Sequence, residues 1–218
     1  MRRSPFVLIS SLACLAPPML AALVLLPVVA SATTLQKLEM DDLIRQSTAI
    51  VRARVTGTSA MARGGDVYTL YHLDIAEHIK NGVKTEAGSA AGISELAVPG
   101  GVAGGLRQMV PGAPVLQRGR EYLLFLWTGR SGITQLMGLS QGLFTVAQTA
   151  GGEAKIVQTK ATERMLDGSG RAVQPGVLML TLAELRLRVR LFGSKSPGSK
   201  LHGSQPDEYG TPKKVAGN

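Results

Sequence analysis

The side chains best suited to bind a metal or move a proton are His72, Asp74 and His78, which share one predicted strand. Alternate residues of a regular strand share a face, so the three side chains would project to one side. At about 3.3 Å per residue, however, the Cα atoms of the two histidines lie roughly 20 Å apart, too far for one metal bound at about 2 Å per ligand. His72 and Asp74 therefore remain a candidate metal half-site, and the simpler interpretation is a polar strand face in water.

A second candidate for chemistry is Ser140. The string Gly138-Leu139-Ser140-Gln141-Gly142 matches the G-x-S-x-G pattern of a hydrolase nucleophile elbow. An elbow joins a strand to a helix, whereas the sequence after Gly142 predicts another strand, and the only later histidine is His202. A hydrolase with Ser140 as its nucleophile is therefore an alternative hypothesis.

A glycine-rich stretch, Pro99–Pro114, is predicted to be a long loop. Its glycine spacing fits neither of the common phosphate-binding motifs. Long loops in compact domains are often functional, so Arg107 and Met109 are candidate ligand-binding residues. Tyr68, on the exposed side of the strand that carries His72, is a third. The alternative is a structural loop whose glycines allow positive φ angles and close packing.

The strand expected at the centre of the fold is Tyr122–Trp127, which follows a polar turn at Arg118-Gly119-Arg120. Six large apolar residues in a row are typical of a strand that is buried on both faces. The residues between Gly57 and Gly65 are predicted to be a loop. The other predicted strands, most of them with one apolar face, are Ala49–Val55, Val67–Lys80, Glu95–Val98, Ile133–Leu139, Leu143–Val146 and Ala154–Gln158.

Two helices are predicted near the ends of this series of strands, at Leu35–Gln46 and Thr181–Phe192. Thr181 and Glu184 have the spacing of a capping box. The second helix interleaves arginines with apolar residues, which suits either packing on the sheet with solvated arginines or contact with an anionic membrane or nucleic acid. Consecutive strands with terminal helices predict a mainly β fold: a small antiparallel OB-like barrel or sandwich with short flanking helices, the barrel being the first expectation.

Residues 1–32 have the pattern of a secretory signal, with Arg2 and Arg3 before an apolar stretch at 6–30 and an Ala-Ser-Ala cleavage site. We therefore expect a secreted or periplasmic protein with a β domain at 33–193 and a disordered tail at 194–218. An uncleaved membrane anchor at 6–30 is the alternative. The single cysteine, Cys14, lies in the signal, so the mature chain would have no disulfide, thiol nucleophile or thiolate metal site.

Several strings resemble those of a group of exported bacterial proteins of unknown function. They are Leu43 to Val55, Ile79-Lys80-Asn81-Gly82, Val98-Pro99-Gly100-Gly101, Gly119 to Leu126 and Gln141-Gly142-Leu143-Phe144. More distantly, the string from Gly119 to Leu126 is similar to a strand of netrin-like and metalloproteinase-inhibitor domains, which are OB-type barrels. Those inhibitors engage the metal of a protease through an N-terminal cysteine, which the mature chain would lack, so their mechanism is not implied.

The formal net charge is +9, and it falls to +7 if the two leader arginines are removed. Such a balance suits association with anionic polymers. The predicted function is therefore an exported, non-enzymatic binding or structural module of the cell envelope that needs no cofactor. Its partner would be an envelope protein or an anionic polymer and not a nucleic acid, with membrane contact only through 6–30. The alternatives are a hydrolase that uses Ser140 and a metal site at His72 and Asp74.

Overall fold

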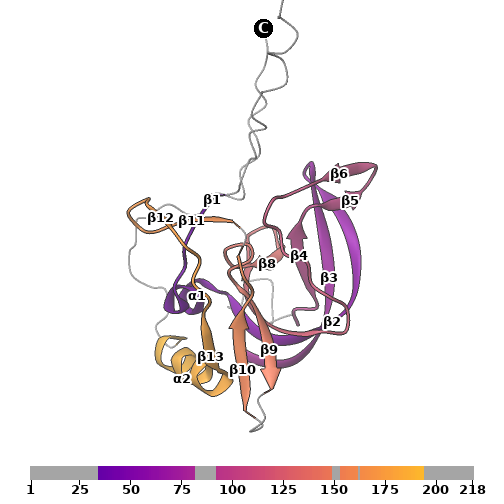
Figure 1. The fold of residues 1–218 in the computed structure, drawn as a ribbon. Coiled ribbons are helices and arrows are strands. Elements are labelled where there is room, and N and C mark those ends of the chain that lie inside the picture. Colours follow the sequence, from indigo (N-terminus) through magenta and orange to yellow (C-terminus); the bar gives the residue numbers. More distant parts are fainter. Residues whose placement is uncertain (1–33, 82–91, 149–152, 162, 194–218) are drawn as a thin grey trace, which may run out of the picture. The chain divides into compact units, whose positions relative to one another are not determined.

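The computed structural model describes residues 34–81, 92–148, 153–161 and 163–193, so the predicted signal and the predicted tail lie outside the described residues. The described chain is mainly β with two short helices, as predicted (Figure 1). Its elements are β1 (Thr34–Gln36), α1 (Met40–Gln46), β2 (Ala49–Arg63), β3 (Asp66–Lys80), β4 (Glu95–Pro99), β5 (Gly101–Ala103), β6 (Leu106–Gln108), β7 (Glu121–Thr128), β8 (Thr134–Leu136), β9 (Leu143–Gln148), β10 (Ala154–Gln158), β11 (Arg164–Leu166), β12 (Ala172–Val173), β13 (Met179–Thr181) and α2 (Leu182–Gly193).

The main sheet is antiparallel and has the order β13-β10-β9-β7-β2-β3-β4, with β8 paired to β7 beyond the end of β9. The sheet curves until β4 and β8 line one small cavity of about 10 Å³. Within the described residues no ladder joins these two strands, so the expected closed barrel is wrong and a β-sandwich with short helices describes the fold. Among the described strands, the three-residue β8 pairs with β7 alone, so the sheet does not close into a barrel.

The sheet has an apolar core on each face. The inner core includes Val51, Ala53 and Val55 of β2 with Tyr71, Leu73, Leu96 and Leu124. The helix-side core joins Leu43 and Ile44 of α1 and Leu185 of α2 to Ile50, Leu123, Phe125, Phe144 and Ile156. β7 supplies alternate side chains to both cores, which confirms the prediction of a central strand that is buried on both faces.

The predicted loop at Gly57–Gly65 is wrong, because β2 continues as a strand to Arg63. The turn is limited to Gly64 and Gly65, which both have positive φ angles and so suit a two-residue hairpin. The segment before that turn contains small and polar residues without apolar alternation. Its strand conformation comes from pairing with β3 along the whole hairpin, which local sequence does not encode.

Two other predictions also differ from the structure. Residues 101–108 of the predicted glycine-rich loop form the short hairpin β5–β6, with its turn at Gly104 and Gly105. The first predicted helix is divided: Thr34–Gln36 pairs in parallel with β11, and α1 begins only at Met40. Gln141 keeps the first part extended, because its side chain accepts from the Leu38 N–H and donates to the Gln36 carbonyl.

β3 contains an extra residue at Ala76, since Ile75 pairs with Ala53 while Glu77 pairs with Arg52. A bulge of this kind shifts the alternation of side chains by one residue. Ile75 accordingly packs against the inner core, whereas Ile79 packs against the helix-side core. Regular alternation along the predicted strand Val67–Lys80 would have placed both isoleucines on one face, and the bulge separates them.

Candidate binding surface

The hairpin β5–β6 is fastened to the outer end of β3 by backbone and side-chain hydrogen bonds. The Gly100 N–H donates to the Val67 carbonyl at 2.7 Å, and the Thr69 hydroxyl donates to the Gly100 carbonyl at 2.8 Å. The Val67 N–H donates to the Gln108 side chain at 2.6 Å. Gly101 has a φ of +131°, and a Cβ at that position would lie 2.7 Å from the Thr69 hydroxyl oxygen. The hairpin is therefore held in a defined position, as Figure 1 shows beside the tip of β2 and β3.

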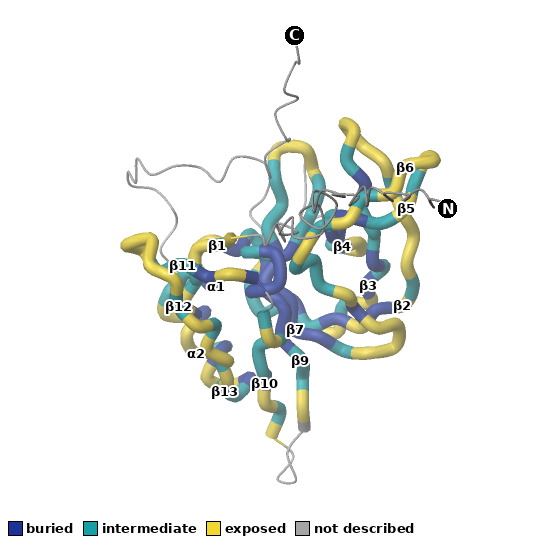
Figure 2. The backbone as a smooth tube through the Cα atoms, turned by 45° about the horizontal axis from the view of Figure 1, so that its top comes forward, coloured by how far each residue is buried: buried dark blue, intermediate teal, exposed yellow. Residues whose placement is uncertain are grey.

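The hairpin exposes large apolar side chains that have no place in either core. Val102 is 62% exposed, Leu106 is 50% exposed and Met109, directly after β6, is 83% exposed. Arg107 is also exposed and pairs across the ladder with Val102. We call Val102, Leu106, Arg107 and Met109 the hairpin patch; Val102 and Arg107 share one face of the ladder, and Leu106 projects from the other. Figure 2 shows this end of the molecule as largely exposed, whereas β7 is dark blue.

The charged side chain of the hairpin patch is Arg107, and the nearest acid that contacts the hairpin is Asp66, which accepts from the Gln108 side chain at 3.4 Å. Residues 99–120 contain three arginines, at 107, 118 and 120, and no acidic residue. An exposed arginine beside exposed apolar side chains is complementary to a partner with acidic and apolar groups. Such a surface differs from ordinary solvated strand faces, which lack clustered large apolar side chains.

Of the three predicted ligand-binding residues, the structure brings Arg107 and Met109 together and places Tyr68 elsewhere. Val67 and Thr69 approach β5 with their side chains. Tyr68 alternates with them and lies opposite Met61 and Pro99, on the other face of the sheet. Val102 and Leu106 were missed by the sequence analysis. The signal that identifies them is the pair Gly104-Gly105 between them, which is typical of a two-residue hairpin turn.

The predicted metal half-site has a different arrangement in the structure. His72 Nδ1 lies 3.1 Å from Glu95 Oε1 on β4, and Asp74 lies opposite Arg54 on β2. His78 lies opposite Val51, which belongs to the inner core, so the bulge at Ala76 places it on the other face of the sheet from His72 and corrects the shared face predicted above. No group of three His, Cys, Asp or Glu residues suited to a metal ion occurs in the described part of the chain.

Ser140 is buried in a tight turn between β8 and β9, and it is followed by a strand. The backbone conformation and close packing of this turn explain both glycines of the hydrolase-like string. Gly138 has a φ of +60°, and a Cβ on Gly142 would lie 2.8 Å from the Phe125 carbonyl oxygen. The residue with a strained backbone is Leu139, with a φ of +61°, rather than the serine. The glycines are therefore needed for the turn. Within the described residues, neither histidine of β3 forms a hydrogen bond with the Ser140 hydroxyl.

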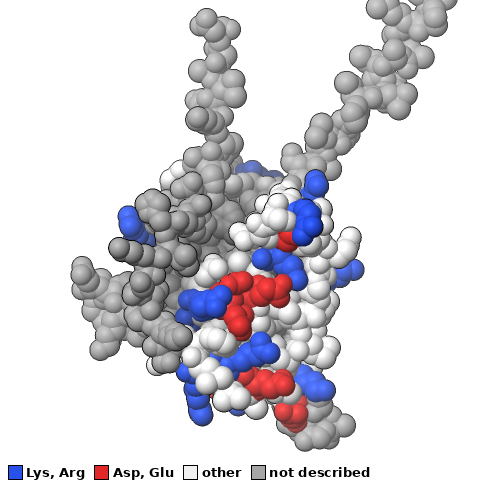
Figure 3. Space-filling model, turned by 90° about the vertical axis from the view of Figure 1, so that its left-hand side faces the viewer, with Lys and Arg blue, Asp and Glu red and all other residues white. Residues whose placement is uncertain are grey.

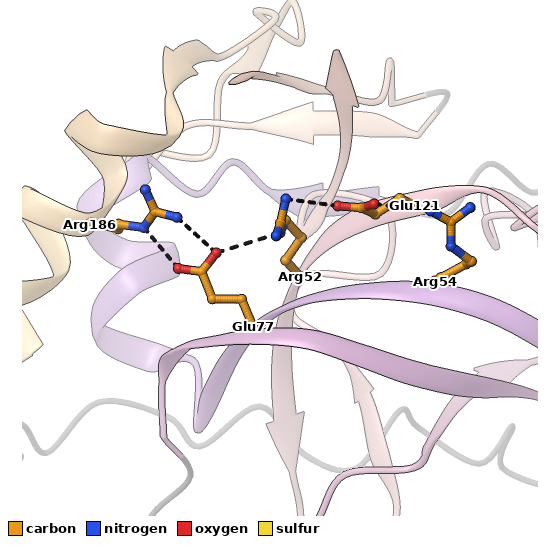
Figure 4. Close-up of polar contacts among 5 residues, drawn as sticks. All are labelled: Arg52, Arg54, Glu77, Glu121 and Arg186. Carbon is orange, nitrogen blue, oxygen red and sulfur yellow. Dashed lines mark hydrogen bonds and ion pairs between the residues drawn. The ribbon is translucent and has the colours of Figure 1, made fainter. Parts of the chain in front are cut away.

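A chain of ion pairs lies between the sheet and α2 (Figure 4). Arg186 donates two hydrogen bonds to the Glu77 carboxylate, at 2.8 and 2.9 Å, and Arg52 lies 3.5 Å from Glu77 and 3.2 Å from Glu121. The hydrogen bond from Arg186 lowers the pKa of Glu77, and the charges of Arg186 and Arg52 act in the same direction against the effect of burial. This arrangement docks α2 on β2 and β3, and the bulge at Ala76 creates it by turning Glu77 toward the helix.

The arginines of α2 are therefore not a free basic surface. Arg186 is paired with Glu77, and Arg188 lies 3.6 Å from Asp41 of α1. Figure 3 shows acidic side chains among the basic ones on this side of the described molecule. The Arg186 and Arg188 side chains are still 43% and 50% exposed, so these two arginines are solvated, as expected, and also take part in ion pairs. The apolar stripe does pack on the sheet, through Leu182, Leu185 and Val189, and the Thr181–Glu184 capping box is present.

No family model, curated protein or solved structure matches this chain. In the described part of the chain no helix is long and apolar enough to cross a membrane.

Proposed function

We propose that the protein is an exported binding module of the cell envelope whose contact surface is the hairpin patch. The observation that carries the proposal is the exposure of Val102, Leu106 and Met109 beside Arg107 on a hairpin that is firmly fastened to β3. A fixed hairpin loses little conformational entropy on binding, so its exposed apolar area is available as binding free energy. Export is supported by the signal-like pattern of residues 1–32.

The partner that suits this surface is an envelope protein that presents acidic groups beside apolar ones. The basic stretch 99–120 would attract it over a distance, and the apolar side chains would provide contact that persists when salt screens the charges. An anionic polymer alone would use the arginines and leave the apolar side chains without a role. Binding that survives moderate salt therefore distinguishes the protein partner from the polymer.

The test is a photo-crosslinking comparison in envelope extract with a crosslinker at position 109. We expect a defined crosslinked protein at moderate salt, and its loss in the double variant Leu106→Ser/Arg107→Glu. The matched control is Leu187→Ser/Leu191→Ser on α2, because those leucines are 58% and 62% exposed and lie away from the hairpin. Equal crosslinking in both double variants, or crosslinking that disappears with salt alone, would contradict the proposal.

Export has its own test. If residues 1–32 are a cleaved signal, the protein recovered from the envelope fraction begins at Thr33 and has lost both leader arginines. N-terminal sequencing measures this directly. A chain that retains residues 6–30 in the membrane fraction would instead support the anchored alternative.

A further inference from the structure

Among the described strands, the outer part of β2 has a hydrogen-bonded neighbour on one side only. β7 pairs with β2 from Ala49 to Arg54, and one further contact joins Val55 to the turn at Gly119 and Arg120. From Thr56 to Arg63, β2 pairs with β3 alone among the described strands. We call this stretch, 56–63, the open edge. An open edge presents unpaired N–H and C=O groups that another strand is able to bind.

The hairpin turn determines which residues point toward the open edge. Arg63 and Asp66 flank a two-residue turn and pair with each other, so the backbone groups of Arg63 point to β3. Backbone direction alternates along an antiparallel strand. Thr58, Ala60 and Ala62 therefore direct their N–H and C=O groups away from β3, and all three are exposed.

Common protections of an edge strand are sparse along this stretch. Natural edges usually carry proline, lysine, an inward-pointing charge or a bulge. Between Gly57 and Ala62 the sequence is Gly-Thr-Ser-Ala-Met-Ala, without proline or charge, and the one bulge, at Thr56, lies at the inner limit of the stretch. The outward-pointing backbone N–H and C=O groups of this segment are therefore regularly spaced for pairing with another strand.

We infer that the open edge binds a second copy of this chain as an antiparallel strand, so that two sheets join across a two-fold axis at Ala60. In that register Ala60 lies opposite its own symmetry mate, Thr58 opposite Ala62, and Ser59 opposite Met61. The only charged residue, Arg63, lies opposite Gly57 of the second copy. No like charges face each other in the joined ladder, and all outward-pointing residues meet outward-pointing partners, which is the requirement for a self-complementary edge.

The open edge shares no residue with the hairpin patch, although Ala62 lies beside the hairpin turn at Gly104, and the two interactions should respond differently to salt. Each copy carries a formal net charge of +9, or +7 without the two leader arginines, so screening should strengthen the dimer. Binding of an acidic partner at the hairpin patch should weaken in the same range. The effect of salt on dimerisation and on partner binding therefore shows which of the two proposals has failed.

The experiment is sedimentation velocity on the purified protein over a concentration series at low and moderate salt. We expect a monomer–dimer equilibrium in the wild-type protein. Ala60→Lys should raise the dissociation constant at least tenfold, because it places two ammonium groups at the axis. Ala60→Glu should do the same, and an equimolar mixture of the two variants should recover a heterodimer. The matched control is Ser59→Lys, which adds the same charge away from the axis and should have a smaller effect.

Three results would overturn the inference: a wild-type protein that stays monomeric throughout the series, a mixture of the Lys and Glu variants that forms no heterodimer, or a Ser59→Lys variant as impaired as Ala60→Lys. Circular dichroism of each variant shows whether the fold is kept. Should Ala60→Lys fail to fold, Ala60→Pro serves in its place, since the N–H that it removes points away from β3 and is needed only for the second copy.

Discussion

The inner and outer halves of the hairpin β2–β3 are continuous in backbone and opposite in character. In the inner half, β2 lies between β7 and β3, and its residues Ile50 and Val51 are fully buried in different cores. In the outer half, the same strand pairs with β3 on one side and with no described strand on the other, and Thr58 and Ala60 are exposed. The inner half stabilises the domain, and the outer half carries the surfaces at which we propose that partners bind. Mutations in the inner half of β2 should therefore affect stability, and mutations in its outer half should affect binding.

The largest expected effect is in the inner half. Ile50→Ala removes a side chain that is packed among α1, β7 and α2, and it should lower the free energy of unfolding by about 2–5 kcal/mol through lost burial and an unfilled cavity. Thr58→Ala in the outer half should change it by no more than about 0.5 kcal/mol. Urea unfolding measures both. Similar losses at the two positions would contradict the division of the hairpin.

An intermediate effect is expected where the β5–β6 hairpin joins the outer half. Gly101→Ala forces a left-handed φ on an L residue and brings its Cβ against the Thr69 hydroxyl, so it should cost about 1–3 kcal/mol. Hydrogen exchange should show faster exchange at Val67 and Gly100 than at β7. Gly105→Ala is the control: its φ is +76° but its added Cβ meets no atom within 4 Å, so it should leave the exchange at Val67 unchanged.

The ion pair between Glu77, in the inner half of the hairpin, and Arg186 should contribute less to the free energy of unfolding, and its contribution should depend on pH. Glu77→Gln should lower the free energy of unfolding by about 1–2 kcal/mol at pH 7, since hydrogen bonds between charged groups are stronger than neutral ones. Because the pKa of Glu77 is lower in the fold than in the unfolded chain, the unfolded chain binds more protons in the acid range. The stabilisation is complete above the unfolded pKa and disappears as the pH falls through the folded pKa.

Unfolding measured between pH 7 and pH 3 should therefore show a difference between wild type and Glu77→Gln that narrows toward acid pH. Glu95→Gln, at the half-exposed pair with His72, is the control and should change stability by less than about 0.5 kcal/mol at pH 7. A difference between wild type and Glu77→Gln that stays constant down to pH 3 would show that the carboxylate charge contributes nothing.

The smallest expected effect on stability is at the hairpin patch itself. Met109→Ser replaces a side chain that is 83% exposed, so the free energy of unfolding should stay within about 0.5 kcal/mol of wild type. The midpoint of urea unfolding measures this. A clear loss of stability would mean that Met109 packs within its own chain, which would remove the main support for the proposed contact surface.

Sequence patterns predicted the elements whose signal is local. The apolar run of β7, the alternation of inner β2 and the capping box of α2 all appear in the structure, because each depends on neighbouring residues. Arg107 and Met109 are exposed, and their predicted role as contact residues stays a prediction. The outer half of β2 was missed, because its strand conformation depends on pairing with β3. The open edge could not be predicted, since it follows from where β7 ends.

The extra residue at Ala76 divides β3 into two segments whose apolar alternation is in opposite phase. Tyr71, Leu73 and Ile75 enter the inner core, whereas Glu77 and Ile79, two and four residues further on, face the helix side. Removing Ala76 would carry the Glu77 carboxylate to the face of the inner core and leave Arg186 without its counter-charge, while Arg52 would keep only Glu121. The exact number of residues in β3 therefore matters as much as their identity, because it determines which face of the sheet each side chain occupies.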